Sequence, residues 1–308
     1  MTYRLSVGFF LKNFKKGRNN MAIVVPEIFA DATNAALDHS IRIGRIAFDA
    51  TDLVGDIREC GDTVHFPVID RISDAEVMED GTELTPSEVS MTDNTAKIKQ
   101  VGKAVRIYDK HSTQVKGQLI DSMATQIGEA MADAIDKDLI AEMDKSAAYK
   151  VAYATKEHPE LADGNNITYE LIESGFDCFG DKADVNTAGI IINSRLRRSF
   201  LGMTEFVKRD YAFSNDANGG VANDGVIGYW RGSIPVILSN NGTYDEEKDE
   251  CKTYLVKNLA LGIIKQKDAS IEEQRESLKK ATLISADEMY AVKLIDPKGV
   301  VIIRKTIE

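Results

Sequence analysis

The side chains that could bind a metal or act as nucleophiles are few and scattered along this chain. None of the three cysteines, Cys60, Cys178 and Cys251, forms a C-x-x-C pair, and isolated cysteines of this kind are typical of thiols in a reducing compartment. The four histidines lack the i, i+4 spacing and the neighbouring cysteines of helical or finger-type zinc sites. The sequence therefore predicts no metal site, and we expect no cofactor.

Motifs that carry catalysis are also absent. The chain has no glycine-rich dinucleotide or phosphate loop, no H-E-x-x-H and no G-x-S-x-G. Arg195, Arg197 and Arg198 could bind an anion, but such a cluster is more typical of a solvated helix face or a subunit contact. We predict no catalytic residue and no enzyme. Since active sites can be assembled from distant residues, an uncharacterised α+β enzyme stays an alternative.

The amino-acid composition limits the classes of protein to which this chain can belong. The 308 residues, 43% of them hydrophobic, allow one large domain or two interleaved ones. The net charge of −11 argues against a surface that grips phosphates, because duplex binding needs clustered Lys and Arg. It is compatible with a protein that encloses nucleic acid. No stretch approaches the roughly 20 apolar residues that span a bilayer, so no membrane contact is expected.

The clearest concentration of charge lies in residues 63–110. A strand is predicted at Thr63–Ile69, an acidic loop over 70–96, and a basic return strand over 97–108. A two-stranded arm without a core is not stable alone, so we expect it to lie on another copy of the chain. Opposite charges would set the register between subunits, although a merely solvated acidic loop is an open alternative. The candidate assembly residues are Asp74, Glu76, Glu79, Asp80, Glu83, Lys97, Lys99 and Lys103.

A long helix over residues 112–147 follows this arm. Its apolar residues recur at every fourth position, so each step turns about 40° around the axis and the stripe sweeps around most of the helix. One flat neighbour could not cover such a stripe. We therefore predict a spine helix that contacts several elements in succession. Its candidate core residues are Leu119, Met123, Ile127, Met131, Ile135 and Leu139.

The remaining patterns indicate an α+β fold. Helices are predicted over 26–38, 168–180 and 195–201, and residues 41–48 read as an arm laid along a surface. Strands are predicted over 188–192, 225–229, 233–239, 253–256, 260–265, 281–294 and 300–305.

This order of parts resembles the major capsid proteins of tailed bacteriophages, which share the Hong Kong 97 fold. The resemblance runs from about Met21 to the C-terminus. It is carried by TVHFPVI before the acidic loop, GKAVRIYDK before the spine helix, GIIINSRLRR, and GVIGYWRGSIPVILS. It implies an α+β, Hong Kong 97-like capsid fold with an N-arm, an E-loop hairpin, a long spine helix, and peripheral and axial domains.

The resemblance also implies a division of the chain. Residues 1–20 would be an upstream extension or a disordered tail, with Met1 or Met21 as the start. Residues 21–62 would form the N-arm and 63–110 the E-loop. The peripheral domain would hold 111–166 and 266–295, and the axial domain 167–265 and 296–308.

The function implied is that of a major capsid protein. It would self-assemble, as hexamers and pentamers, into an icosahedral shell around the double-stranded DNA of a tailed phage or prophage. A separate scaffolding protein, a portal, assembly in the host bacterial cytoplasm and a final place in the virion are expected. The type member links subunits through an E-loop lysine, and residues 70–96 contain none, so no such crosslink is expected. The alternative from the same fold is an encapsulin-type nanocompartment shell.

Overall fold

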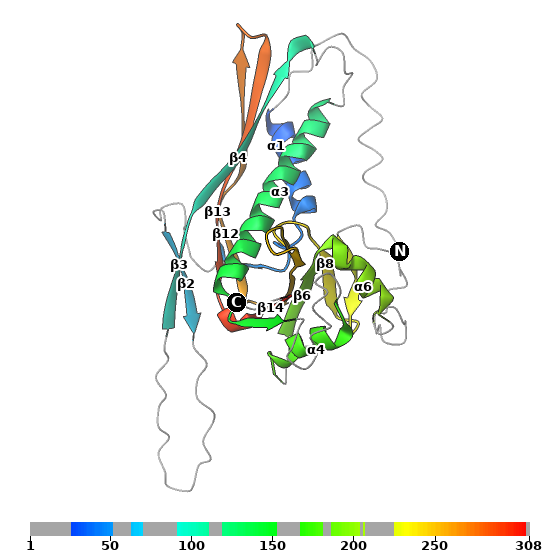
Figure 1. Cartoon of the computed structure of the whole chain (residues 1–308). Coiled ribbons are helices and arrows are strands. Elements are labelled where there is room, and N and C mark those ends of the chain that lie inside the picture. The colour runs from blue at the N-terminus through cyan, green and yellow to red at the C-terminus, as the bar shows by residue number, and fades with distance from the viewer. Residues whose placement is uncertain are drawn as a thin grey trace, which may run out of the picture.

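The computed structural model describes residues 26–51, 63–69, 91–110, 119–152, 167–180, 186–203, 206 and 225–305. Within these ranges the chain forms two large β-sheets, and one long helix, α3 (Leu119–Ser146), runs along the first and reaches the second (Figure 1). One apolar core joins α3 to strands of both sheets. The fold is therefore α+β, as the sequence predicts, and is organised around α3.

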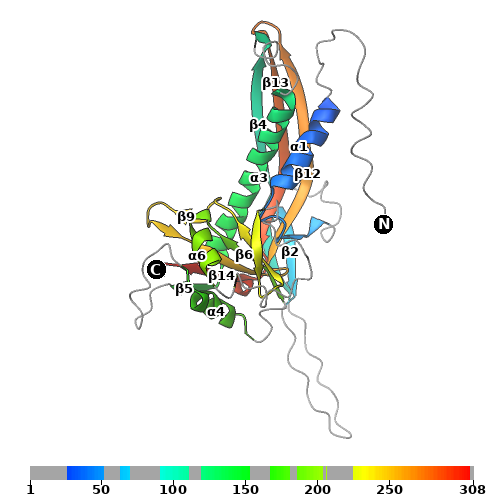
Figure 2. The same ribbon diagram turned by 90° about the vertical axis from the view of Figure 1, so that its right-hand side faces the viewer.

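The first sheet has four strands and extends away from the rest of the molecule (Figure 1). In spatial order its strands are β1 (Phe48–Asp49), β12 (Leu261–Glu276), β13 (Ala281–Leu294) and β4 (Lys99–Tyr108). Helix α1 (Pro26–Ser40) and α3 lie side by side on one face of this sheet (Figure 2). Buried β-branched and aromatic side chains such as Ile284 and Tyr290 point to that face, as the period of two in a strand requires.

The second sheet has six strands. In spatial order they are β5 (Tyr149–Ala152), β14 (Val300–Arg304), β11 (Thr253–Lys257), β6 (Thr187–Ile192), β8 (Ile234–Leu238) and β7 (Val226–Trp230). One face carries Tyr254, Val256 and Ile302 into the core that contains α3. The other face packs under α4 (Tyr169–Asp177) and α6 (Arg197–Gly202), around Trp230 and Phe200. Because both faces are covered, its central strands are apolar runs such as GIII in β6.

Short elements complete the described chain. A two-stranded ribbon pairs β9 (Tyr244–Asp245) with β10 (Glu250–Cys251). Single 3₁₀ turns occur at Ser194–Leu196 and Pro297–Gly299, each capped by the side chain before it, Asn193 or Asp296. No described helix has the length and apolar character needed to cross a membrane.

The pairing predicted for residues 63–110 is wrong. Strand β2 (Thr63–Ile69) pairs with β3 (Met91–Lys97), from Thr63 opposite Lys97 to Ile69 opposite Met91. The predicted return strand is instead β4, which pairs antiparallel with β13 in the four-stranded sheet. The loop expected over 70–96 is therefore shorter, because its last residues form β3. The sequence MTDNTAK has a single apolar residue after Met91, so no alternation marks it as a strand.

Other predictions differ less from the structure. Residues 41–48 lie along the main core as an arm would, with Ile41 and Ile43 buried in it and Arg42 and Arg45 exposed. The strand predicted over 260–265 continues through two register shifts to Glu276, because its polar second half is held by pairing with β13. The predicted start of the spine helix at residue 112 lies outside the described residues.

Strand pairing crosses the domain divisions implied by the resemblance. Strand β5 pairs with β14 in the six-stranded sheet, while β4 and the first residues of β12 belong to the four-stranded sheet. We therefore propose domain boundaries that follow the two sheets, with β2–β3 as the hairpin between them.

Replacing Ile135 by Ala tests the packing of α3. Ile135 is fully buried in the main core, and a buried Ile to Ala change leaves a cavity that costs about 2–5 kcal/mol. Denaturant unfolding of the unassembled protein should show this loss. Lys137, exposed on the same helix, is the matched control, and Lys137→Ala should change stability by less than about 0.5 kcal/mol. Equal effects of the two changes would contradict burial of α3.

Candidate assembly surfaces

Polar contacts tie α3 to the elements around it. Five acidic side chains of the helix each bind another segment, and they do so on different sides of the helix. Asp133 accepts from Asn241 Nδ2 (2.7 Å), and Asp144 accepts from Lys252 Nζ (2.8 Å) and Tyr254 OH (2.7 Å). Asp138 binds Tyr290 OH and Lys99 Nζ at 3.0 Å each, and Glu142 pairs with Lys293 at 3.1 Å. The fifth, Asp136, binds backbone after α1. These bonds connect α3 to both sheets and to the N-terminal segment.

Asp136 is the most buried of these acids. Its Oδ1 accepts the backbone N–H groups of Ile43 (3.1 Å) and Gly44 (3.2 Å), and its Oδ2 accepts that of Arg42 (3.2 Å). Burial raises the pKa of Asp136 to about 6, although the three N–H bonds oppose this rise. The carboxylate therefore holds the turn that follows α1 against the middle of α3.

The base of the β2–β3 hairpin rests on the first sheet. Val64, Phe66 and Ala96 pack with Ile264 of β12 and Ala291 of β13 in a small separate core. Asn94 Nδ2 donates to the carbonyl of Ile295 at 3.3 Å. The hairpin is thus seated at its base, while the residues between its strands lie outside the described chain.

The tip of the β12–β13 hairpin is fixed by ion pairs. Both terminal nitrogens of Arg275 bind the carboxylate of Asp109 at 2.6 Å, and this hydrogen bonding lowers the pKa of Asp109. Arg106 of β4 pairs at 3.1 Å with Glu276 of β12, across β13, which lies between these two strands. Leu278, in the turn itself, is 99% exposed. These two ion pairs hold the ends of the strands together at the tip of the hairpin.

The predicted basic assembly residues lie on two different strands. Lys97 ends β3, whereas Lys99 and Lys103 lie on β4, the outer strand of the first sheet. Lys99 is engaged within the chain by Asp138. Lys97 and Lys103 are exposed and form no ion pair with another described residue. The acidic residues Asp74, Glu76, Glu79, Asp80 and Glu83 lie outside the described residues.

The predicted core positions of α3 are mostly buried. Ile127, Met131, Ile135 and Leu139 are almost fully buried, and Met123 is partly buried against the same core. The side chain of Leu119 lies outside the described residues. The helix contacts α1, β13 and β4, and its core includes residues of the second sheet.

The arginine cluster does not form an open anion site. The guanidinium of Arg195 stacks on the ring of Tyr244 at 3.8 Å and lies 3.9 Å from Asp249. Arg197 and Arg198 are exposed on α6. Among the described residues no cluster of His, Cys, Asp or Glu has the geometry of a metal site, and Cys178 and Cys251 are free thiols.

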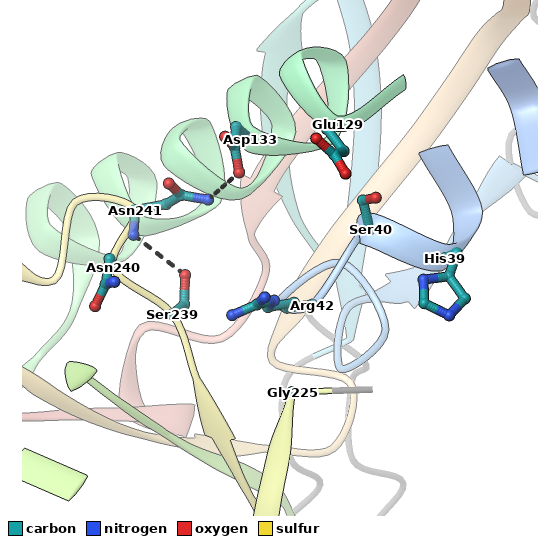
Figure 3. Close-up of a pocket in the computed structure, with 9 residues that line it drawn as sticks. All are labelled: His39, Ser40, Arg42, Glu129, Asp133, Gly225, Ser239, Asn240 and Asn241. Carbon is teal, nitrogen blue, oxygen red and sulfur yellow. Dashed lines mark hydrogen bonds between the residues drawn. The ribbon is translucent and has the colours of Figure 1, made fainter. Parts of the chain in front are cut away.

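A polar pocket of about 550 Å³ lies between α1, α3 and the loop after β8 (Figure 3). Glu129 and Asp133 line its α3 side, and Arg42 extends toward Ser239 across it. Arg42 donates to the carbonyl of Leu238 at 2.9 Å. The lining is charged and amide-rich, so this pocket is not an apolar peptide groove.

Sequence comparison gives one informative relative. No protein-family model matches the chain. The chain is 24% identical over 285 residues to the major capsid protein of Staphylococcus phage phiMR11, covering 92% of this chain and 93% of that protein. Among solved structures, the capsid of Cyanophage P-SCSP1u aligns with a TM-score of 0.59 at 14% identity, over 87% of this chain and 89% of that one. In sequence and in fold, the chain is similar to the major capsid proteins of tailed phages.

The chain also has a second kind of structural neighbour. A virus-like particle from Pyrococcus furiosus aligns with a TM-score of 0.55 at 15% identity, over 90% of this chain and 98% of that one. Identities this low establish the shared fold, the Hong Kong 97-like fold, and nothing finer. The predicted fold class is confirmed.

Sequence reasoning missed Asp136 as a functional residue of the capsid protein. The signal is present, because Asp136 lies four residues after Ala132 and four before Ile140, and both are buried. An acid in the middle of an apolar helix face has to be paired or hydrogen-bonded. Its partners, the N–H groups of residues 42–44, could not be identified from spacing.

Proposed function

We propose that this capsid protein assembles, as hexamers and pentamers, into the icosahedral shell that encloses the double-stranded DNA of a tailed phage or prophage. The observation that carries the proposal is the alignment to a major capsid protein over more than nine-tenths of both chains. The protein would act by repeated self-association, with no bond made or broken. The net charge of −11 supports enclosure of DNA without sequence-specific binding.

The proposal includes further partners and a place of action. A separate scaffolding protein would guide curvature, and a portal would occupy one vertex. Assembly would take place in the host bacterial cytoplasm, and the finished protein would reside in the virion. These parts follow from the likeness to phage capsid proteins.

A nanocompartment shell is the second candidate, favoured by the particle from Pyrococcus furiosus. A cargo-loading shell would need an apolar groove for a cargo peptide. The pocket formed by the described residues is polar and carries Glu129, Asp133 and Arg42. This lining favours the phage capsid.

Electron microscopy of the expressed, purified protein tests the proposal. We expect rings or closed shells in negative stain, with nucleic acid inside particles recovered from phage-producing cells. A protein that stays a monodisperse monomer across all concentrations would contradict a shell of either kind. Particles filled with one cargo enzyme and lacking nucleic acid would instead indicate the nanocompartment.

For the contact between subunits, we propose that the acidic segment 70–90 of one copy lies against Lys97 and Lys103 of another. Both lysines are exposed, and opposite charges speed encounter and set register. Lys99 is the weaker candidate because it already pairs with Asp138.

Charge reversal tests this contact. Lys97→Glu with Lys103→Glu should slow assembly, followed by light scattering, by at least roughly tenfold at low salt. Adding Glu79→Lys and Glu83→Lys to the same chain should restore the rate. Lys137→Glu, exposed on α3, is the control and should leave the rate unchanged. A reversal that slows assembly no more than this control, or that the compensating pair does not rescue, would contradict the pairing.

A further inference from the structure

Helix α1 is seated very closely on α3. At Gly128 of α3, an added Cβ would lie 2.8 Å from the carbonyl oxygen of Thr33 and 2.9 Å from the Cβ of Ala36. Thr33 and Leu37 of α1 are buried. Figure 2 shows α1 lying along α3 over β12. The helix pair therefore depends on a glycine, and a larger side chain there would push α1 away.

The turn after α1 is bound at both of its sides. On one side, Asp136 accepts the N–H groups of Arg42, Ile43 and Gly44. On the other, the guanidinium of Arg42 reaches the end of β8 at the carbonyl of Leu238 (Figure 3). The turn therefore links the middle of α3 to the end of β8.

Among the described residues, no cation faces the carboxylate of Asp136. Its neighbours are the three N–H groups and the carboxylate of Asp133 on its own helix, which disfavours a second negative charge. Since Oδ1 accepts two of the N–H groups and Oδ2 only one, a proton on Oδ2 would leave the two bonds to Oδ1 intact.

A second buried carboxylate lies in the sheet under α1. Glu288 of β13 is 1% exposed, and its Oε2 has no hydrogen-bond partner among the described residues. Lys265 lies 3.9 Å from its other oxygen. Asp268 of β12 and Asp38 of α1 add repulsion, and burial, the larger cause, raises the pKa of Glu288.

We propose that α1 and the turn over residues 41–44 form a proton-linked latch, in which Asp136 and Glu288 take up protons when the latch is closed on α3 and the first sheet. The latch is independent of the proposed shell function, because it rests on contacts within one chain. It would let acidity set how firmly the N-terminal segment is held.

The direction of the linkage follows from the two states. With the latch open, Asp136 would meet water and titrate near its ordinary pKa of 3.8, whereas with the latch closed it titrates at about 6. The closed state therefore binds protons more tightly, so acidification favours closure and this contribution is lost as the pH rises through about 6. Asp136 alone would shift the equilibrium by up to roughly tenfold per pH unit, about a hundredfold in all.

Hydrogen exchange of the full-length protein, measured at about pH 5, 6 and 7.5, tests the latch. Exchange rates of peptides from α1 are converted to protection factors, which removes the intrinsic pH dependence, and β11 serves as the internal reference. We expect protection of α1 to fall by at least roughly tenfold between about pH 5 and 7.5, while β11 stays constant. Protection of α1 that is constant, or that rises with pH, would overturn the proposal.

Variants separate the latch from general stability. Asp136→Asn combined with Glu288→Gln mimics the protonated carboxylates and should abolish the pH dependence of α1. Glu142→Gln, which removes a carboxylate of α3 paired with Lys293, should leave it intact. Gly128→Leu should displace α1 from α3 at every pH. The protection of α1 measured in this variant therefore gives the value expected for the open state. A double variant whose α1 protection depends on pH as in the wild type would overturn the proposal. If the double variant does not fold, the pH dependence measured for the wild-type protein still tests the proposal.

Discussion

The burial of α3 on several sides is the interaction on which the rest of the structure depends. Its apolar positions advance around the axis, so successive residues meet α1, the first sheet and the second sheet. Burial of one large aliphatic side chain contributes about 1.5–3 kcal/mol, and α3 places several of them in one core. The acids of α3 then fix its direction, since together they bind the turn after α1, β13 of the first sheet, β11 of the second sheet and the loop after β8.

The packing around α3 explains how the chain adopts a single architecture although its sequence carries few recognisable motifs. The two sheets are not hydrogen-bonded to each other; they meet in the core around α3. The long β12–β13 hairpin packs under α1 and α3, and the base of the β2–β3 hairpin packs on β12 and β13 in a small separate core. Such hairpins suit a protein whose free surfaces are completed by other copies, as in a shell.

The sequence predicted the parts of the fold that depend on strong periodicity. The fourfold stripe from Ile127 to Leu139 identified α3 and its need for several neighbours, and the apolar run at β6 identified a buried strand. Strand β3 could not be predicted, because its buried Ala96 is too weak a signal. The pairing of β4 with β13 joins segments far apart in the chain, and local patterns carry no information about such partners. For the same reason the sequence indicated Lys97, Lys99 and Lys103 as a basic group, but it could not predict the ion pair between Lys99 and Asp138.

Native-state hydrogen exchange along the whole chain at low denaturant tests the central role of α3 most directly. If both sheets and α1 depend on α3 for their shared core, its amides between Ile127 and Met143 should exchange only through global unfolding. They should then share the highest opening free energy and the full denaturant dependence. The amides of α1 and of β2–β3 should exchange through smaller, local openings. Exchange of α3 at a lower free energy than the strands of either sheet would contradict the account.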